Sequence, residues 1–412
     1  MPCRIGYLVP EFPGQTHTFF WREVNALEAK GIEVDVVSTR RPANALISHA
    51  WAALAIQRTV YLAPLGLRGV IAVIGQMLSA GPSGWYRCAR AITRARDVLF
   101  EGKVRLLALL LMGAKLAWLA RRRGWQHVHV HSCGDSANAA LFAHLLLGTR
   151  YSLTLHSPLP FFGPNQAQKW RHANFVFCVA RALHQEAAEI LGADFPATVE
   201  IVPMGVDIDG FVRTTEYVAW NGRDPCRIFS CGRLTPGKGF HDLIQAIATL
   251  KQAGLPVHLR IAGEDDSGGV HYRRQLEGLI ADLALGEQVE ILGSVSEAVV
   301  KEELQATHVF ALASHEEALG VATMEAMSMS VPVVVTRVGG VPELVTDGVE
   351  GLMVPPHDAS ALAAGLERVL RDGSLAQRMG RAGRCKVERA FHSRLSVEHL
   401  ASHLLRPWPI KK

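Results

Sequence analysis

Short apolar runs alternate along the whole chain with longer segments in which apolar residues recur at helical spacing. Most of the runs are nearly continuous and rich in β-branched residues, which is typical of parallel strands covered on both faces. This alternation occurs twice and predicts an α/β protein with two doubly wound domains. The predicted strands lie at 4–10, 33–39, 127–132, 151–157, 175–180 and 199–205 in the first half, and at 227–234, 257–263, 289–295, 309–314 and 331–336 in the second.

The length agrees with two domains, because 412 residues exceed what one ordinary hydrophobic core supports. Residues 206–226 carry Gly, Asp and Pro without a clear period, so the boundary is expected there. We predict an N-terminal Rossmann-like domain at 1–205 and a C-terminal one at 206–387. The C-terminal helix within 388–412 is expected to pack back onto the first domain. Ligands of such sheets bind outside the carboxyl ends of the strands, so the residues that follow the strands are candidates for a site.

The composition is that of a globular protein, with 49% hydrophobic and 20% charged residues. The net charge of +5 is mild and does not by itself argue for nucleic acid. The seven cysteines are odd in number and form no CxxC pair, which fits a reducing cytosol better than disulfides or structural zinc. We expect a cytoplasmic protein, because the N-terminus lacks the pattern of a signal peptide and the apolar segment 104–120 is interrupted by Lys115.

A basic turn follows the predicted strand at 227–234. Arg233 and Lys238 flank a Pro-Gly turn, and Gly237 and Gly239 let the backbone come close to a ligand. An arginine fork together with a lysine point charge suits a diphosphate. A solvated surface turn explains the same residues, and this segment alone does not separate the two interpretations.

Three carboxylates follow the strand at 309–314, within the stretch SHEEALGVATMEAM. Gly320 is expected to begin a helix whose free backbone N–H groups favour an anion. Glu317 precedes this helix and Glu325 lies inside it, and a carboxylate can accept hydrogen bonds from a pair of sugar hydroxyls. Complementing the helix dipole is the simpler explanation, and it accounts for Glu316 better than for Glu325.

The stretch EEALGVATMEAMSMSVPVVVTRVGG resembles the signature of the family 4 retaining glycosyltransferases, in which seven residues separate two glutamates, as they do in Glu317 and Glu325. VPMGVD, GRLTPGKGF, LRIAGE and GLMVPPHD also resemble family segments, so the likeness covers nearly the whole second half. The resemblance implies the GT-B fold, two Rossmann-like domains facing a central cleft. It also implies a UDP- or GDP-sugar donor and no metal or other cofactor.

The first half resembles the family more loosely. His156 corresponds to the histidine that faces the donor sugar, and PEFPGQTHTFF, which contains Gly14, takes the place of the first glycine-rich loop. This loop is similar to the exopolysaccharide and colanic-acid branch, which implies a glycan or lipid-linked acceptor and an acceptor role for Thr16, His17 and Thr18. Other positions depart from the family pattern, which usually has glycine, glycine and asparagine where this chain has Ala318, Ser330 and Met204.

The resemblance gives the candidate residues their roles. Arg233 and Lys238 would neutralise the diphosphate, Glu317 would hold the sugar hydroxyls, and Glu325 would hold the ribose. The candidate catalytic residues are His156, Arg233, Lys238 and Glu317, and the candidate donor-binding residues are Gly14, Arg233, Lys238, Glu317, Gly320, Val321, Ala322 and Glu325.

Two segments have the residue types of metal sites, the acidic loop 264–266 and the alternating His127, His129 and His131. We interpret the loop as solvated and the histidines as polar residues on one sheet face near the cleft, because a zinc site needs about three such ligands and an open position.

The segment 85–125 carries ten basic residues interleaved with apolar ones. A basic amphipathic helical region fits an anionic membrane surface, here the inner face of a membrane, and a helical face with solvated charges explains it equally well.

Three other function classes stay open. A dinucleotide-dependent oxidoreductase would need a GxGxxG motif after the first strand, and LVPEFPGQTHTF does not contain one. A nucleotide-sugar epimerase would convert the donor without an acceptor. An inactive nucleotide-sugar-binding module would bind the donor without turnover.

Overall fold

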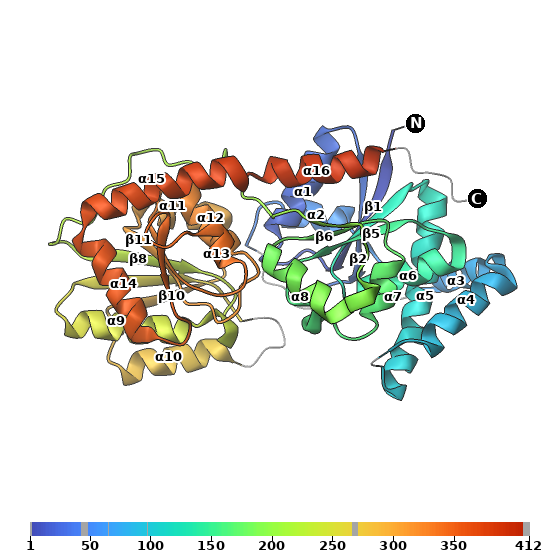
Figure 1. The fold of residues 1–412 in the computed structure, drawn as a ribbon, viewed down its shortest axis with the longest axis horizontal. Helices are drawn as coiled ribbons and strands as arrows, with labels where there is room; N and C mark the ends of the chain where they lie inside the picture. The colour runs from blue at the N-terminus through green and yellow to red at the C-terminus, as the bar shows by residue number, and fades with distance from the viewer. Residues whose placement is uncertain (1, 43–47, 65, 97, 266–270, 407–412) are drawn as a thin grey trace. The chain divides into compact units, whose positions relative to one another are not determined.

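The computed structural model describes residues 2–42, 48–64, 66–96, 98–265 and 271–406. The chain divides into two compact units (Figure 1). The first consists of the described residues of Met1–Pro42, Trp51–Val202 and Val397–Lys412, and the second mainly of Pro203–Ser396. Each is an α/β unit built on one parallel sheet, and each is described by itself.

In the first unit, the described strands form a seven-stranded parallel sheet in the order β3-β2-β1-β4-β5-β6-β7. Tyr7 of β1 lies opposite Val36 of β2 and His129 of β4, so β1 and β4 are the central pair from which the order runs outward. The strands are β1 (Arg4–Glu11), β2 (Glu33–Arg40), β3 (Val60–Tyr61), β4 (His127–His131), β5 (Tyr151–Leu155), β6 (Val176–Cys178) and β7 (Val199–Ile201).

Two helices from opposite ends of the chain share one face of this sheet. Phe20 and Val24 of α1 belong to the same hydrophobic cluster as Leu400 and Leu404 of α16. Fully burying such side chains contributes roughly 1.5–3 kcal/mol each. The helices of the first unit are α1 (Thr18–Ala29), α2 (Ala52–Arg58), α3 (Leu67–Ser79), α4 (Gly81–Thr93), α5 (Phe100–Arg123), α6 (Asp135–Leu147), α7 (Gln166–Arg171), α8 (Arg181–Leu191) and α16 (Ser393–Leu405).

In the second unit, the described strands form a six-stranded parallel sheet in the order β10-β9-β8-β11-β12-β13, the strand order of a dinucleotide-binding Rossmann fold. The strands are β8 (Cys226–Cys231), β9 (Val257–Ala262), β10 (Val289–Gly293), β11 (Val309–Leu312), β12 (Val333–Thr336) and β13 (Gly351–Val354). The helices are α9 (Phe240–Gln252), α10 (Tyr272–Asp282), α11 (Glu297–Ala306), α12 (Val321–Ser328), α13 (Val341–Leu344), α14 (Ala359–Arg371) and α15 (Gly373–Ala390).

Every strand predicted from the pattern is present, with ends that differ by a few residues. β3 and β13 were not predicted. β3 has two residues, which is too short to show an alternation. β13 has four residues, begins with Gly351 and includes a methionine, so it lacks the β-branched run by which the other strands are found.

The division between the units falls between Val202 and Pro203, three residues before the predicted boundary, and the chain returns to the first unit at Val397 rather than at 388. The backbone explains why the residues between these positions belong to the second unit. Val206 donates to the Phe391 carbonyl (2.8 Å) and accepts from the Ser393 N–H (2.9 Å). Gly205 permits this approach, because a Cβ there would lie 2.3 Å from the Ser393 nitrogen.

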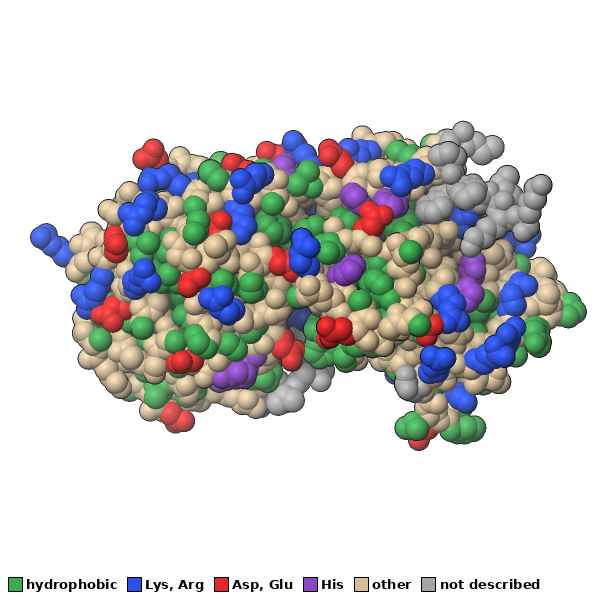
Figure 2. Space-filling model, in the orientation of Figure 1, with side chains coloured by type: hydrophobic (Ala, Val, Ile, Leu, Met, Phe, Trp, Pro, Cys, Tyr) green, Lys and Arg blue, Asp and Glu red, His purple; other side chains and the backbone are tan. Residues whose placement is uncertain are grey.

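Exposed hydrophobic side chains gather on α3, α4 and α5, of which α4 and α5 cover most of the predicted basic segment. Leu78, Tyr86, Leu99 and Phe100 are 65–84% exposed. Figure 2 shows hydrophobic and basic side chains next to one another in this region, at the lower right.

Candidate functional site

The strand order of the second sheet runs outward in both directions from β8 and β11, which are paired to each other. Ligands of doubly wound sheets bind at such a switch point, outside the carboxyl ends of the strands. The loop after β8 contains the short helix η3 (Pro236–Lys238), and the loop after β11 leads to Gly320 at the start of α12. A site of the second unit is therefore expected in these two loops.

The two loops contact each other through their backbones. The His315 N–H donates to the Gly237 carbonyl (2.8 Å). A Cβ on Gly239 would lie 1.9 Å from the Ala313 carbonyl oxygen, and Gly239 has a φ of +62°, which side chains disfavour. Only glycine fits at this position, and it lets the loops approach each other closely enough for their side chains to meet.

Lys238 and Glu317 form an ion pair between the loops, with 2.5 Å between Nζ and Oε2. Ser314 Oγ donates to the same carboxylate oxygen (3.3 Å). The two side chains are 21% and 12% exposed, so the pair is partly shielded from water and still accessible. An anionic ligand can share Lys238 with Glu317, while the carboxylate stays an acceptor for hydroxyl groups.

The first turn of α12 begins beside this pair. Gly320 precedes it with a φ of +98°, and no side chain caps the helix. The N–H groups of the first turn, among them those of Val321 and Ala322, have no acceptor inside the helix and favour an anion. A Cβ on Gly339 would lie 1.9 Å from the Glu317 carbonyl oxygen, so a second glycine holds this loop in place.

The other two candidates of the second unit lie at the same edge of the sheet. Arg233 belongs to the loop after β8 and its side chain is exposed, while Glu325 is inside α12 and partly buried. Burial raises the pKa of Cys231, the last residue of β8, to about 12, and the charges of Glu325 and Lys238 both act on this thiol. The structure therefore brings all the candidates of the second unit to one edge of its sheet.

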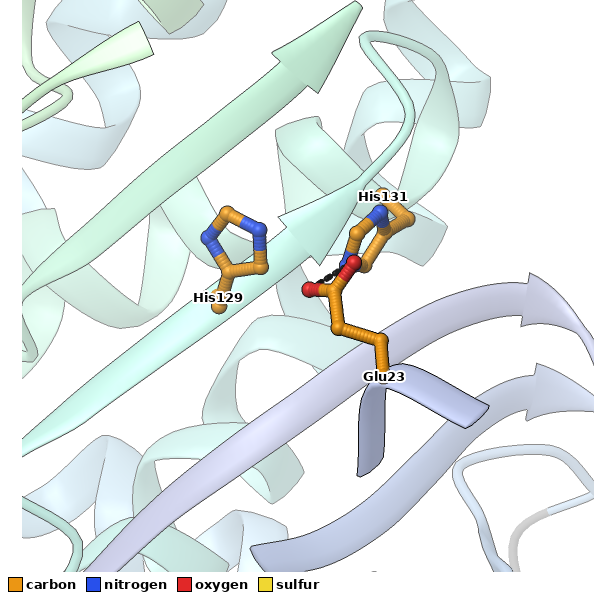
Figure 3. A group of neighbouring side chains, drawn as sticks. All are labelled: Glu23, His129 and His131. Carbon is orange, nitrogen blue, oxygen red and sulfur yellow. Dashed lines mark ion pairs between the residues drawn. The ribbon is translucent and has the colours of Figure 1, made fainter. Parts of the chain in front are cut away.

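In the first unit, His156 follows β5 and belongs to a chain of three side chains. Its Nε2 lies 2.9 Å from Nδ1 of His131. On the other side of the His131 ring, Nε2 lies 3.4 Å from the Glu23 carboxylate (Figure 3).

Burial, followed by the charges of His131 and His17, lowers the pKa of His156 well below its usual range. The ring is therefore neutral at pH 7. A neutral imidazole with an acceptor nitrogen suits a sugar hydroxyl as hydrogen-bond partner.

Gly14 also belongs to the first unit, in the loop after β1. The His17 N–H donates to the Gly14 carbonyl (3.0 Å), and a Cβ on Gly14 would lie 2.7 Å from the His17 ring. The loop thus forms a tight turn in which the His17 ring packs against the backbone of Gly14. Of the residues considered for the acceptor, Thr16 is exposed, while His17 and Thr18 are partly buried.

The alternating histidines of β4 are buried and held by hydroxyl groups. His127 Nε2 and His129 Nδ1 lie 2.8 and 2.7 Å from Ser152 Oγ, and His129 Nε2 lies 3.1 Å from Thr154 Oγ1. They share one sheet face, as predicted, and they take part in a hydrogen-bonded interior.

In the acidic loop, Glu264 pairs with Arg273, and Asp265 accepts from the Arg273 N–H (3.0 Å). Asp266, the third acid of that prediction, lies outside the described residues.

Sequence reasoning missed some polar neighbours of this edge. His315 Nε2 lies 2.6 Å from Asp242 Oδ2, and the His315 ring lies tilted by 37° against the His357 ring, with 3.6 Å between ring centroids. Asp242 lies in α9, while His315 and His357 belong to the loops after β11 and β13, so the three residues form no motif. Gly339 was inside the quoted signature, and its position in the loop after a predicted strand was the only available signal.

Two family models match the chain. Residues 17–209 match "Glycosyltransferase Family 4", and residues 220–386 match "Glycosyl transferases group 1". Among curated relatives, a protein of Salmonella typhimurium named as a colanic acid biosynthesis glycosyltransferase is 35% identical over 51% of each chain. The amylovoran biosynthesis glycosyltransferase of Erwinia amylovora is 35% identical over 44% of this chain and 45% of its own. The chain thus spans about half the length of these relatives.

Solved structures show the fold. The HepE protein of Anabaena, crystallised with UDP-glucose, superposes with a TM-score of 0.73 over 97% of this chain and 99% of its own, at 19% identity. The two Rossmann-like units are those of the GT-B fold. Between them the two family matches extend from residue 17 to residue 386, and the chain belongs to the family 4 glycosyltransferases.

Proposed function

We propose that the chain is a retaining, metal-independent hexosyltransferase that moves a sugar from a UDP- or GDP-sugar to a glycan or lipid-linked acceptor. The product would be an exopolysaccharide or another cell-surface polysaccharide. The observation that carries the proposal is the Lys238–Glu317 pair beside the uncapped start of α12, at the switch point of the second sheet. The names of the relatives and the UDP-glucose bound to the Anabaena protein support it.

The proposed reaction exchanges one bond at the anomeric carbon for another. The bond from this carbon to the donor diphosphate breaks, and a bond to the acceptor oxygen forms on the same face. The proton of the acceptor hydroxyl passes to the leaving diphosphate. Negative charge develops on the diphosphate, where Arg233, Lys238 and the N–H groups of Gly320, Val321 and Ala322 stabilise it. Such charge stabilisation is often the largest catalytic contribution.

The carboxylates and the histidine position the substrate. Glu317 accepts hydrogen bonds from the transferred sugar, and Glu325 accepts them from the ribose diol. His156, whose ring is neutral at pH 7, would contact the transferred sugar. Gly14 lets the backbone of its loop approach the donor.

The first test is calorimetric binding of UDP, GDP and ADP to wild type and to Arg233→Ala. We expect one nucleotide to bind clearly and to bind about 10–100-fold more weakly in the variant, because a charge-assisted hydrogen bond contributes about 1.5–3 kcal/mol. Arg227→Ala is the matched control, since Arg227 is an exposed arginine of β8, the strand that leads into the loop of Arg233. Equal binding by wild type and Arg233→Ala would remove Arg233 from the site, and no binding at millimolar nucleotide would contradict the proposal.

The two rival functions are separated by products. An epimerase releases an isomerised nucleotide sugar and needs no acceptor. An inactive module binds the nucleotide sugar and releases no nucleoside diphosphate under any condition. Incubation of the donor with and without a candidate acceptor, followed by analysis of nucleotide and sugar products, therefore decides among the three functions.

The proposed setting is the cytoplasmic face of a membrane, where the surface of α3, α4 and α5 would contact anionic lipid. None of the described helices has the length and apolar character needed to cross a bilayer. Leu78 and Phe100 are exposed on α3 and α5, and the segment 85–125 carries ten basic residues; basic and apolar side chains together bind anionic interfaces. All seven cysteines, each among the described residues, are free, which fits a reducing compartment.

Sedimentation with liposomes tests this surface. Wild type is expected to bind vesicles that contain anionic lipid at low salt, and Leu78→Ser and Phe100→Ser to bind about tenfold more weakly each, because each removes a large apolar side chain from the contact. Val218→Ser, which alters an equally exposed side chain of the second unit, is expected to bind like wild type. Wild-type protein that ignores anionic vesicles at low salt would disprove the membrane contact.

A further inference from the structure

Three groups of histidine and carboxylate side chains in the described part of the chain have ligand atoms within 4.8 Å of one another. In the group of Figure 3, both ring nitrogens of His129 are already hydrogen-bonded to hydroxyls, and His131 is bonded to His156. A second group, around Asp242 and His315, adjoins the loop of Lys238, whose positive charge opposes a cation. The third group lies elsewhere, and its ligand atoms point at one another.

The third group joins the last helix to the edge of the first sheet. Glu200 is the middle residue of β7, the edge strand, and His399 and His403 are four residues apart on α16, so both rings lie on one face of the helix. His399 Nε2 lies 2.6 Å from Glu200 Oε2, and His403 Nε2 lies 3.1 Å from Glu200 Oε1. Two imidazole nitrogens thus converge on the two oxygens of one carboxylate.

These distances suit a metal ion. Bonds of roughly 2.0–2.2 Å in a tetrahedral site place neighbouring ligand atoms about 3.3 Å apart. The observed separations are slightly shorter, so the side chains need to open only by a fraction of an ångström. Two histidines at i and i+4 with one carboxylate are a ligand set that zinc uses in proteins.

The surroundings of the group also permit binding. The His403 ring packs against Phe175 and Phe177, which holds this ligand in place. Neutral imidazole and ionised carboxylate are the forms that ligate metals. The His399 and Glu200 side chains are 43% and 40% exposed, so an ion can enter and a water can complete the coordination.

We propose that Glu200, His399 and His403 bind a divalent transition-metal ion, Zn²⁺ in the first instance, which fastens α16 to β7. The chain returns to the first unit through α16, so the ion would fix the last helix on an otherwise open sheet edge. The site takes no part in the proposed sugar transfer, and its test does not depend on that function.

The test titrates chelator-treated full-length protein with ZnCl₂ by calorimetry, and with Co²⁺ by the visible absorption of tetrahedral cobalt. Wild type is expected to bind the ion, and His399→Ala and Glu200→Gln are each expected to bind it more than about 100-fold more weakly. Removing a residue that only hydrogen-bonds a metal ligand lowers metal affinity about 10–100-fold, and removing a ligand itself should lower it further. His271→Ala, which removes an exposed histidine of the second unit, should bind like wild type.

Melting provides a second measurement. Saturating Zn²⁺ should raise the melting temperature of wild type and leave that of His399→Ala unchanged, because an ion that binds the folded state stabilises it. His399 is half exposed, so the alanine variant is expected to fold. Absence of binding at about 100 µM Zn²⁺, or binding that neither His399→Ala nor Glu200→Gln weakens, would overturn the proposal.

Discussion

Lowering the pH from 7 to 5 is expected to destabilise the first unit strongly, because it holds neutral histidines that cannot take up protons without unfolding. Burial, with the charges of Arg150 and His403, lowers the pKa of His127 to about 3. Burial likewise lowers the pKa values of His129 and His156 well below the usual range. In the unfolded chain these histidines have their ordinary pKa near 6.5. Below that pH the unfolded chain therefore binds protons that the folded chain does not bind.

The sign of the effect follows from that difference in bound protons. Above pH 6.5 neither state is protonated at His127, and the histidine has no influence. As the pH falls toward 3, the unfolded state carries one more proton at His127 than the folded state, so the lower pH favours unfolding. From pH 7 to pH 5, His127 alone lowers the free energy of unfolding by about 2 kcal/mol. His129 and His156 act in the same direction, so the unit should unfold well before its surface carboxylates titrate.

Urea unfolding at pH 7 and pH 5 measures this loss, with the fluorescence of Trp125 and Trp170 as the report from the first unit, where both are buried. His127→Gln keeps a group that can bond Ser152 and removes the titration. The variant is expected to be less stable at pH 7 but to lose about 2 kcal/mol less between the two pH values. His271→Gln, on an exposed histidine, should show the wild-type difference. Equal losses in wild type and His127→Gln would mean that His127 is protonated in the folded state.

The pattern of apolar runs predicted both sheets because parallel strands covered on two faces must be apolar over their whole length. β4 is the instructive exception. Its three histidines are as buried as valines would be, and they are tolerated because they have polar partners: Ser152 and Thr154 on the neighbouring strand bond His127 and His129, and His156 after that strand bonds His131. The alternation placed these side chains on one face. The sequence could not show that they are buried, since the partners lie about 25 residues away.

The site could be predicted from the sequence where its residues lie in the loops that follow strands. Arg233, Lys238 and Glu317 could be found because each follows the end of a strand in a loop with glycine. The ion pair between Lys238 and Glu317 depends on the approach of two loops separated by 79 residues, which no local pattern contains.

The same limit applies to the first unit. Glu23, His131 and His156 come from α1, β4 and the loop after β5, and their contact is purely tertiary.

Ser330 shows how a departure from a family pattern can be read in physical terms. It stands where the family usually has glycine, and its φ is +55°, in the left-handed region that glycine favours. The backbone of the turn after α12 has therefore kept the conformation of a glycine, although the residue has changed. Gly380 lies against the Ser330 carbonyl, where a Cβ would approach to 2.2 Å, so the surrounding packing holds the turn in place.

Replacing Lys238 by alanine is expected to have the largest effect on the proposed reaction. Lys238 is the cation held closest to the carboxylate at the switch point, where the departing diphosphate would gain charge. Removing one such stabilising group typically lowers kcat by about 10²–10³-fold. The measurement is release of nucleoside diphosphate from whichever nucleotide sugar binds, with water as the acceptor, so that the natural acceptor is not required. Melting of the variant checks that it folds.

Glu317 provides a matched comparison, because Glu316 is its exposed neighbour in the same loop. Glu317→Gln is expected to slow nucleotide release strongly, and Glu316→Gln is expected to leave it unchanged. If both variants behave alike, the carboxylates serve only the dipole of α12, and Glu317 has no part in holding the sugar.

The double variant Lys238→Ala with Glu317→Gln separates catalysis from structure. Each single variant leaves one charge of the ion pair without its partner, and the double variant removes that charge as well. If the ion pair only holds the two loops together, activity of the double variant should therefore return toward wild type. If Lys238 stabilises the leaving diphosphate and Glu317 positions the sugar, the double variant should be at least as slow as Lys238→Ala. We expect the second result, because the pair lies beside the first turn of α12, whose N–H groups favour the same anion. Recovery of turnover in the double variant would assign the pair to loop structure and leave Arg233 and the α12 backbone as the donors to the diphosphate.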